Sequence, residues 1–184
     1  IQADVIDTFA RLGRNITPEQ LGKNWYELAA ELGISKERFD EEFDKRKSWE
    51  QALRDGDIDI FPETHRVLSK LRDRGTRMNI LSASIPTYTQ LKLDHFDLTP
   101  YFTEIVTVHP KIPSKISGAK ELVKKLDPST IEKAYFIGDK PGDINVAPEI
   151  QAEYSVPCQG IYVNRQGEQL EGFHNVKSLE GILN

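Results

Sequence analysis

The sequence has very little cysteine and histidine, and it has no long apolar run. A single cysteine, Cys158, excludes an internal disulfide framework and a cysteine-built zinc site. The 4 histidines are scattered without metal-ligand spacing. No apolar run approaches the roughly 20 residues that span a bilayer, and the start Ile1-Gln2-Ala3-Asp4 lacks the pattern of a signal peptide. We therefore expect a soluble, cytoplasmic protein with no membrane partner.

The chain also lacks an excess of positive charge. Its 24 Lys and Arg residues are outnumbered by 29 Asp and Glu residues, which gives a formal net charge of −5. Such a molecule presents no positive field that would gather nucleic acid, so we expect no nucleic-acid partner. Hydrophobic residues make up 38% of the 184 residues, which is enough for one domain core with a small insert.

Residues 1–58 have the periodicity of consecutive helices. Apolar residues recur there at three- and four-residue steps: Ile6, Phe9, Ala10, Leu21, Trp25, Leu28, Ala29 and Leu32. Ser35 is placed to cap a helix that holds Phe39 and Phe43, and Gly33 and Gly56 are placed to end helices. The pattern predicts an all-helical domain over residues 1–58.

Residues 59–184 alternate between helices and short apolar runs. We predict strands at 78–81, 104–108, 134–137 and 160–163, and helices after Pro62 and at 86–95, 117–126 and 143–152. Strands that are apolar on both faces and separated by helices indicate a parallel sheet with helices on both sides. In such sheets ligands gather at the carboxyl ends of the strands, so polar residues that directly follow each strand are the candidate site.

Two carboxylates follow one of these strands. Asp139 and Asp143 lie four residues apart in the turn Gly138-Asp139-Lys140-Pro141-Gly142-Asp143. Carboxylates held at a strand end can bind a hard cation such as Mg²⁺, which prefers oxygen ligands and also binds substrate phosphate. The alternative is an ordinary turn whose acids cap the next helix.

A hydroxyl and a lysine complete the candidate site. Ser82 and Ala83 follow the strand 78–81, where the hydroxyl and nearby backbone amides can hold a phosphoryl oxygen. Lys115 lies ahead of the helix that leads to the Asp139 strand. Alone, a serine after a strand is typical of a turn, and a lysine before a helix is typical of solvated surface.

The order and spacing of these residues resemble the haloacid dehalogenase-like superfamily. Ser82, Lys115 and the pair Asp139 and Asp143 are similar to its second, third and fourth motifs. The segments 59–62 and 100–106 are similar to the return from a helical cap and to the stretch before the lysine motif. The resemblance implies a Rossmann-like α/β core, three layers with a parallel sheet, at 59–184 and an α-helical cap at 1–58.

The resemblance also implies a chemistry, the magnesium-dependent hydrolysis of a small phosphorylated metabolite. Ser82 and Ala83 would hold a phosphoryl oxygen, and Lys115 would offset the negative charge of nucleophile and phosphate. Asp139 would ligate Mg²⁺, and Asp143 would ligate it or orient its shell. Lys111 is the alternative to Lys115, and Ser84 the alternative to Ser82.

One motif of the family is not found in these residues. Family members use an apolar strand ending in Asp-x-Asp, whose first aspartate forms an aspartyl-phosphate and whose second works as acid and base. Asp4 and Asp7 are three apart rather than two, and residues 4–13 fit a first cap helix better. We expect the sequence to begin downstream of the nucleophile, which leaves an open slot in the sheet.

Other activities on the same scaffold remain open. Phosphonate cleavage would use a cap lysine, for which Lys23 is a candidate, whereas metal-free dehalogenation is disfavoured by the acidic pair. A non-catalytic binding protein is the third alternative. Aromatic residues of the helical part are candidates for substrate contact or for core: Trp25, Tyr26, Phe39, Phe43 and Trp49. The sequence does not indicate an oligomeric state.

Overall fold

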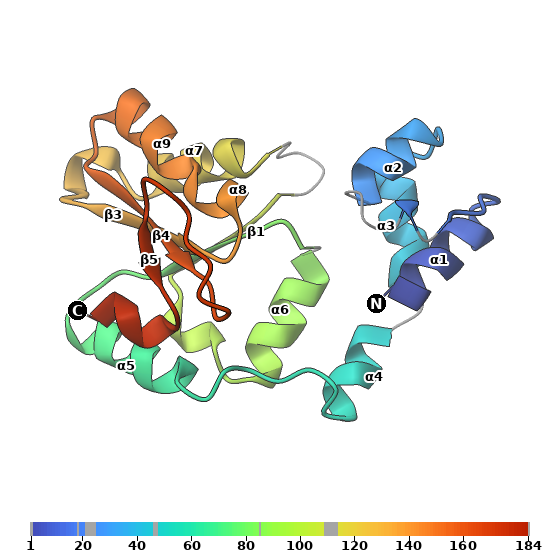
Figure 1. Ribbon diagram of the computed structural model, residues 1–184, viewed down its shortest axis with the longest axis horizontal. Coiled ribbons are helices and arrows are strands. Elements are labelled where there is room, and N and C mark those ends of the chain that lie inside the picture. The colour runs from blue at the N-terminus through green and yellow to red at the C-terminus, as the bar shows by residue number, and fades with distance from the viewer. Residues whose placement is uncertain are drawn as a thin grey trace. The chain divides into compact units, whose positions relative to one another are not determined.

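The chain is divided into two compact units, Ile1–Asp59 and Ile60–Asn184 (Figure 1). The computed structural model describes residues 2–17, 19–20, 25–45, 48–84, 86–108 and 114–183. Within these ranges, no helix is both long and apolar enough to cross a membrane.

The first unit is helical throughout its described elements. It contains α1 (Gln2–Arg11), α2 (Trp25–Glu31), α3 (Lys36–Asp44) and α4 (Ser48–Arg54). Ser35 caps α3 as predicted, because its hydroxyl accepts the backbone N–H of Arg38 at 3.3 Å. Gly33 and Gly56 follow α2 and α4 with φ of 73° and 75°, a left-handed conformation that glycine adopts without strain.

The core of the first unit is aromatic. The rings of Phe9 and Phe39 are buried and lie 5.0 Å apart, and Tyr26 meets Phe39 edge-on at 6.0 Å. Trp25 lies 6.1 Å from Phe43, so four of the five aromatic residues considered for substrate contact take part in mutual packing. The side chain of Trp49 lies outside the described residues.

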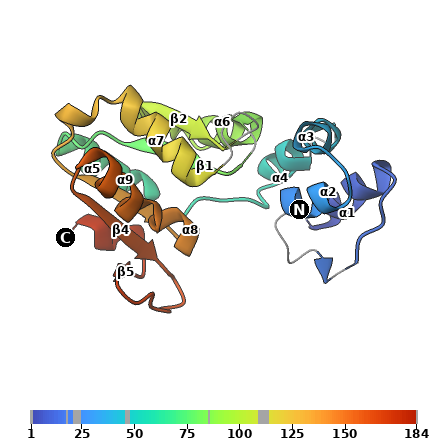
Figure 2. The same ribbon diagram turned by 90° about the horizontal axis from the view of Figure 1, so that it is seen from above.

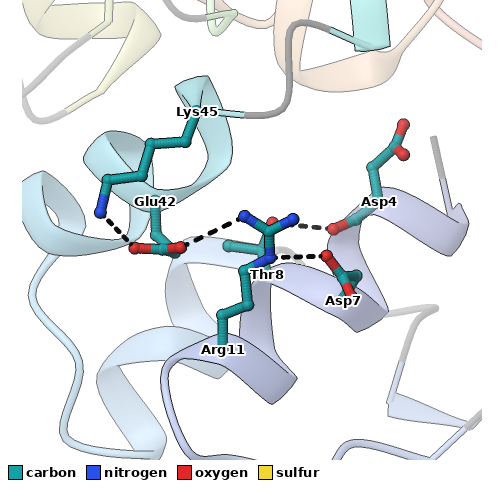
Figure 3. A network of polar contacts seen from close by, with 6 residues as sticks. All are labelled: Asp4, Asp7, Thr8, Arg11, Glu42 and Lys45. Atoms are coloured by element: carbon teal, nitrogen blue, oxygen red, sulfur yellow. Dashed lines mark hydrogen bonds and ion pairs between the residues drawn. The ribbon is translucent and has the colours of Figure 1, made fainter.

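Asp4 and Asp7 belong to the helix α1 and not to a strand (Figure 3). Arg11 Nε contacts the Asp7 carboxylate one turn earlier at 2.9 Å, and its Nη1 lies 3.6 Å from Glu42 on α3. The contact with Asp7 lies within α1, whereas the contact with Glu42 links α1 to α3. The position of Asp4 and Asp7 fits the prediction of a first helix at 4–13.

The second unit alternates helices and strands. Its elements are α5 (Thr64–Asp73), β1 (Asn79–Ser82), α6 (Pro86–His95), η2 (Thr99–Tyr101), β2 (Glu104–Thr107), α7 (Lys115–Lys125), η3 (Pro128–Thr130), β3 (Ala134–Gly138), α8 (Pro141–Ile144), α9 (Val146–Tyr154), β4 (Cys158–Val163), β5 (His174–Val176) and η4 (Leu179–Leu183). The predicted strands and helices are present, which confirms the α/β class.

Three details differ from the prediction. The helix α7 begins at Lys115, because the Ser114 hydroxyl accepts the N–H of Ser117 at 3.1 Å and caps it there; Lys115 is therefore its first residue. The helix predicted at 143–152 is two helices, α8 and α9, which meet at Asn145. The short strand β5 was not predicted, since three residues carry too little alternation to detect.

All strand pairs of the second unit are parallel, and they form two sheets, β1–β2 and β3–β4–β5. In Figure 1, α7 and α9 lie above the strands, and α5 lies with η4 below them. Figure 2 shows β1 and β2 near one edge of this unit and β4 and β5 near the other. The arrangement is the Rossmann-like, three-layer core that the sequence predicted.

One apolar cluster covers both sheets. It consists of Ala119 and Val123 on α7 and Val146 and Ile150 on α9, all at most 4% exposed. Leu81 of β1 and Phe136 of β3 pack against it. The two sheets therefore share the same helical layer.

A charged contact fixes the first residues of the second unit. Glu63 accepts a hydrogen bond from Arg165 at 2.6 Å, and the guanidinium lies 3.3 Å from the ring centre of Phe61. The hydrogen bond from Arg165 holds the pKa of Glu63 below its usual value of 4.5. This contact joins the segment before α5 to the loop after β4.

The lowered pKa predicts a pH dependence of stability. Because the folded carboxyl has the lower pKa, its contribution is complete above the ordinary value of 4.5 and is lost as pH falls through the folded value. We expect Glu63→Gln to flatten the dependence of Tm on pH in this acidic range. The exposed Glu171→Gln is the control, and an equal flattening there would contradict the assignment.

Candidate active site

A pocket of about 240 Å³ lies beside β1 and opens at the carboxyl end of β3. The residues that line it come from both strands, from the start of α7 and from the turn after β3: Asn79, Leu81, Lys115, Ile137, Gly138, Asp139 and Asp143. Three of the four charged or hydroxyl side chains predicted for the site therefore meet in one place, although they are far apart in the sequence.

Gly138 allows Asp143 to fold back over the end of β3. A Cβ atom at position 138 would lie 2.3 Å from Cβ of Asp143 and 2.6 Å from its Oδ2, so a side chain does not fit. The Oδ2 atom accepts the backbone N–H of Lys140 at 3.2 Å. The glycine in the motif is thus required by the close approach of the carboxylate, and the Lys140 N–H fixes that carboxylate.

Lys115 and Asp143 form an ion pair in the pocket. The ammonium group contacts Asp143 Oδ1, and the side chains are 26% and 14% exposed. Because Lys115 is the first residue of α7, the Ser114 cap holds its backbone, and the pair then fixes the ammonium group. A cation held in this way lies beside the strand end, where it can neutralise a bound anion.

Asp139 is the exposed acid of the site. Both oxygens of Asp143 already have partners, whereas Asp139 lines the pocket beside them. Among the described residues, no group of three or more His, Cys, Asp or Glu side chains is placed to hold a metal. Mg²⁺ often takes only one or two protein carboxylates and completes its shell with water and phosphate. The acidic pair fits that kind of site and not a cage built from protein alone.

Ser82 ends β1 and lies outside the residues that line the pocket, although its neighbour Leu81 is one of them. Its Oγ accepts the backbone N–H of Ser84 at 3.0 Å, which orders the turn and leaves the hydroxyl proton to donate. Ala83 in this turn is exposed. Ser84, the alternative to Ser82, thus contributes its backbone to the turn. Lys111 and Lys23 lie outside the described residues.

Asn79 and Ile137 are among the pocket residues that were not anticipated from the sequence. Asn79 lies at the start of β1, and its Oδ1 accepts the N–H of Glu104 at 3.1 Å. Ile137 lies in β3 and is 40% exposed, which is unusual for a large apolar side chain in a parallel strand. Only the position of the two strands relative to each other identifies these residues.

The ion pair predicts an energetic coupling. The variants Lys115→Met and Asp143→Asn each remove the charge attraction. The loss in free energy of unfolding of the double variant is therefore expected to be smaller than the sum of the losses of the two single variants. We expect a coupling of about 1 kcal/mol or less, since the pair is partly solvated. Urea denaturation of the four proteins measures it. Strict additivity would show that the pair contributes nothing to folding.

The family model described as haloacid dehalogenase-like hydrolase matches residues 11–156. No curated protein sequence matches the chain significantly.

Solved structures resemble the chain along almost its whole length. A haloacid dehalogenase-like family hydrolase from Streptococcus pneumoniae has a TM-score of 0.64 at 18% identity, covering 99% of this chain and 90% of its own. A predicted phosphatase from Clostridium acetobutylicum has a TM-score of 0.59 at 16% identity, and the match covers 99% of this chain and 88% of the phosphatase. A proposed hydrolase of this type from Bacillus subtilis, solved with magnesium, has a TM-score of 0.61 at 13% identity. The match covers 98% of this chain and 78% of the hydrolase. These similarities show a common fold.

Proposed function

Because the chain belongs to the haloacid dehalogenase-like hydrolases, we propose that it is a magnesium-dependent phosphatase of small phosphorylated metabolites. The observation that supports this proposal is the meeting of Lys115, Asp139 and Asp143 in one pocket at the strand ends. A cation-binding acid and a fixed ammonium group beside each other suit a phosphate monoester, which carries two negative charges near neutral pH.

Each side chain has a separate part in the proposal. Lys115 contacts a phosphoryl oxygen, and Asp143 keeps the ammonium group in position while accepting the Lys140 N–H. Ser82 donates its hydroxyl proton to a second phosphoryl oxygen, and the backbone N–H of its neighbour Ala83 donates to the same phosphoryl group. Together these contacts orient the phosphorus for in-line attack and disperse its charge.

Asp139 would hold Mg²⁺, with Asp143 nearby to ligate it or to orient its water shell. The ion supplies charge neutralisation of the phosphate when bound. The related hydrolase from Bacillus subtilis was solved with magnesium, which supports the choice of ion. The small number of protein ligands implies that the substrate phosphate is needed to complete the site.

The attacking group is the aspartate of the family's first motif. No apolar run of the 184 residues ends in Asp-x-Asp, and Asp4 and Asp7 lie in the helix α1. Coding sequence upstream of Ile1 that specifies such a strand would supply the nucleophile. A start codon directly before Ile1 would instead favour a non-catalytic phosphate-binding protein.

The helical first unit is proposed to act as the cap that selects the leaving group. Its aromatic residues pack against one another, so selection would depend on other side chains of that unit.

Turnover of an aryl phosphate by the protein expressed from its whole coding sequence tests the proposal. We expect hydrolysis of p-nitrophenyl phosphate with Mg²⁺ and its loss in excess chelator, with activity restored by added Mg²⁺. A phosphonate and a haloacid are assayed in parallel. Equal turnover in chelator, or cleavage of the phosphonate alone, would reject the phosphatase assignment.

A further inference from the structure

A short stretch of chain joins α4 of the first unit to α5 of the second. The backbone bonds that end α4 continue to Asp57, whose N–H donates to the Ala52 carbonyl at 2.9 Å. Ahead of α5, the carbonyl of Phe61 accepts the N–H of Thr64 at 2.9 Å. Residues 58–60 lie between these two turns, and the boundary between the units falls among them. Three residues of extended chain span about 10 Å at most.

The turn at residues 61–64 is fastened by a side chain from another loop. The guanidinium of Arg165 donates to the Glu63 carboxylate at 2.6 Å and lies 3.3 Å from the ring centre of Phe61. The side chain of Glu63 is 11% exposed, so this charged hydrogen bond is partly shielded from water. Phe61 is 52% exposed, and its ring gains a cation–π contact. We call Phe61, Glu63 and Arg165 the Arg165 clamp.

The loop that carries Arg165 is held by its own hydrogen bonds. Asn164 donates its backbone N–H to the Val176 carbonyl at 2.9 Å, and its Nδ2 donates to the Tyr162 hydroxyl at 3.0 Å. Tyr162 is paired with Gly138 in the parallel register of β4 and β3. The loop therefore begins at the same edge of the sheet as the acidic turn of the candidate site.

The helix α5 gives the clamp a second support. Arg66 forms an ion pair with Glu180, and Arg74 donates to the Leu183 carbonyl at 2.8 Å, so the helix contacts η4 at two points. Val67 of α5 is fully buried. The clamp thus joins two segments that are each held without it. A turn beyond a helix end frays readily when no tertiary contact holds it, so opening the clamp should release residues 61–63 and leave α5 folded.

We propose that the Arg165 clamp restricts the movement that this connection allows between the two units, because it fixes the point at which the chain enters the second unit. With the clamp closed, the connection comprises residues 58–60. With the clamp open, it extends over residues 58–63, and its maximum span rises from about 10 Å to about 20 Å. Arg165 is not among the residues that line the phosphate pocket, and the restriction requires neither phosphate nor Mg²⁺.

Hydrogen exchange of the Arg165→Gln variant tests the local part of the inference. Glutamine keeps a polar side chain but removes the charge and the guanidinium plane. We expect the amide of Thr64, which closes the turn, to exchange at least tenfold faster than in the unmodified protein. The amide of Asp57, which is held within the first unit, should keep its rate. The exposed Arg77→Gln is the matched control and should change neither amide.

Distances between spin labels test the movement itself. The labels are attached to cysteines that replace the exposed Glu41 on α3 and Glu149 on α9, in a Cys158→Ser background that removes the natural thiol. Electron–electron double resonance then gives the distribution of distances between the two units. Arg165→Gln should widen this distribution at least 1.5-fold, whereas Arg77→Gln should leave its width unchanged.

Two milder variants each remove one half of the clamp. Arg165→Lys keeps a positive charge for Glu63 but loses the planar group over the ring, and Phe61→Leu removes the ring. Each should widen the distance distribution less than Arg165→Gln does. If Arg165→Gln fails to fold, these two variants carry the test, and widths equal to that of the unmodified protein in both would reject the inference.

Three other results would overturn the inference. An unchanged Thr64 amide in Arg165→Gln would show that the turn holds itself. Faster exchange of Thr64 without a wider distribution would show that the clamp orders the turn but does not restrict movement. Equal widening in Arg77→Gln would indicate a general effect of lost charge. Because no substrate enters these measurements, their outcome is independent of the phosphatase proposal.

Discussion

Asp139→Asn is expected to lower the magnesium-dependent kcat/KM for an aryl phosphate by about a hundredfold or more. The amide keeps the size of the carboxylate but loses the charge that holds the cation. Asp139 is exposed at the pocket, so the substitution should change Tm little. The measurement is steady-state turnover over a range of Mg²⁺ concentrations, where higher Mg²⁺ should partly compensate for weaker binding.

Glu132→Gln is the matched control for this variant. Glu132 is an exposed acid just before the amino end of β3. Its substitution by glutamine therefore removes one negative charge at a position away from the pocket. Its turnover should equal that of the unmodified protein. If Asp139→Asn kept full activity, or if Glu132→Gln lost as much, the assignment of Asp139 as a metal ligand would be wrong.

Gly138→Ala is expected to disrupt the site by a steric route. The added methyl group would lie within 2.7 Å of three atoms of Asp143, so the carboxylate must leave the end of β3. Its departure breaks the contacts with Lys140 N–H and with Lys115. We expect a loss of stability of about 1–3 kcal/mol, the range for overpacked positions, and a large loss of turnover. Chemical denaturation and the phosphatase assay measure the two effects.

Gly142→Ala separates this effect from a general effect of alanine in the turn. Gly142 lies in the same motif, and a Cβ atom there would have no heavy atom within 4 Å. The Gly142→Ala variant should fold normally and keep its phosphatase activity. Comparable losses in both variants would contradict the role given to the approach of Asp143 to Gly138.

The sequence predicted those parts of the structure that depend on local pattern. Helix caps such as Ser35, the apolar runs of the strands and the turn at Gly138 each follow from a few neighbouring residues. The candidate site was predictable to the extent that the acidic pair follows a strand end and that Lys115 lies ahead of the helix leading to that strand, and the structure brings these residues to one pocket.

The remaining features depend on contacts between distant segments. The start of α7 at Lys115 depends on the Ser114 cap, which the pattern that predicted a helix at 117–126 does not reveal. Asn79 enters the pocket only because β1 lies opposite β3. The division into two sheets gives Ile137 its exposure, which alternation of apolar residues along a single strand does not reveal.

Titration of the chain with inorganic phosphate, followed by nuclear magnetic resonance with and without Mg²⁺, tests most directly whether one magnesium-bound phosphate joins these side chains. Phosphate should bind at least tenfold more tightly with Mg²⁺, and the amide signals of Ser82, Lys115 and Asp139 should shift together with a single affinity. Equal binding in chelator, or shifts that leave any of these three residues unchanged, would contradict a shared site.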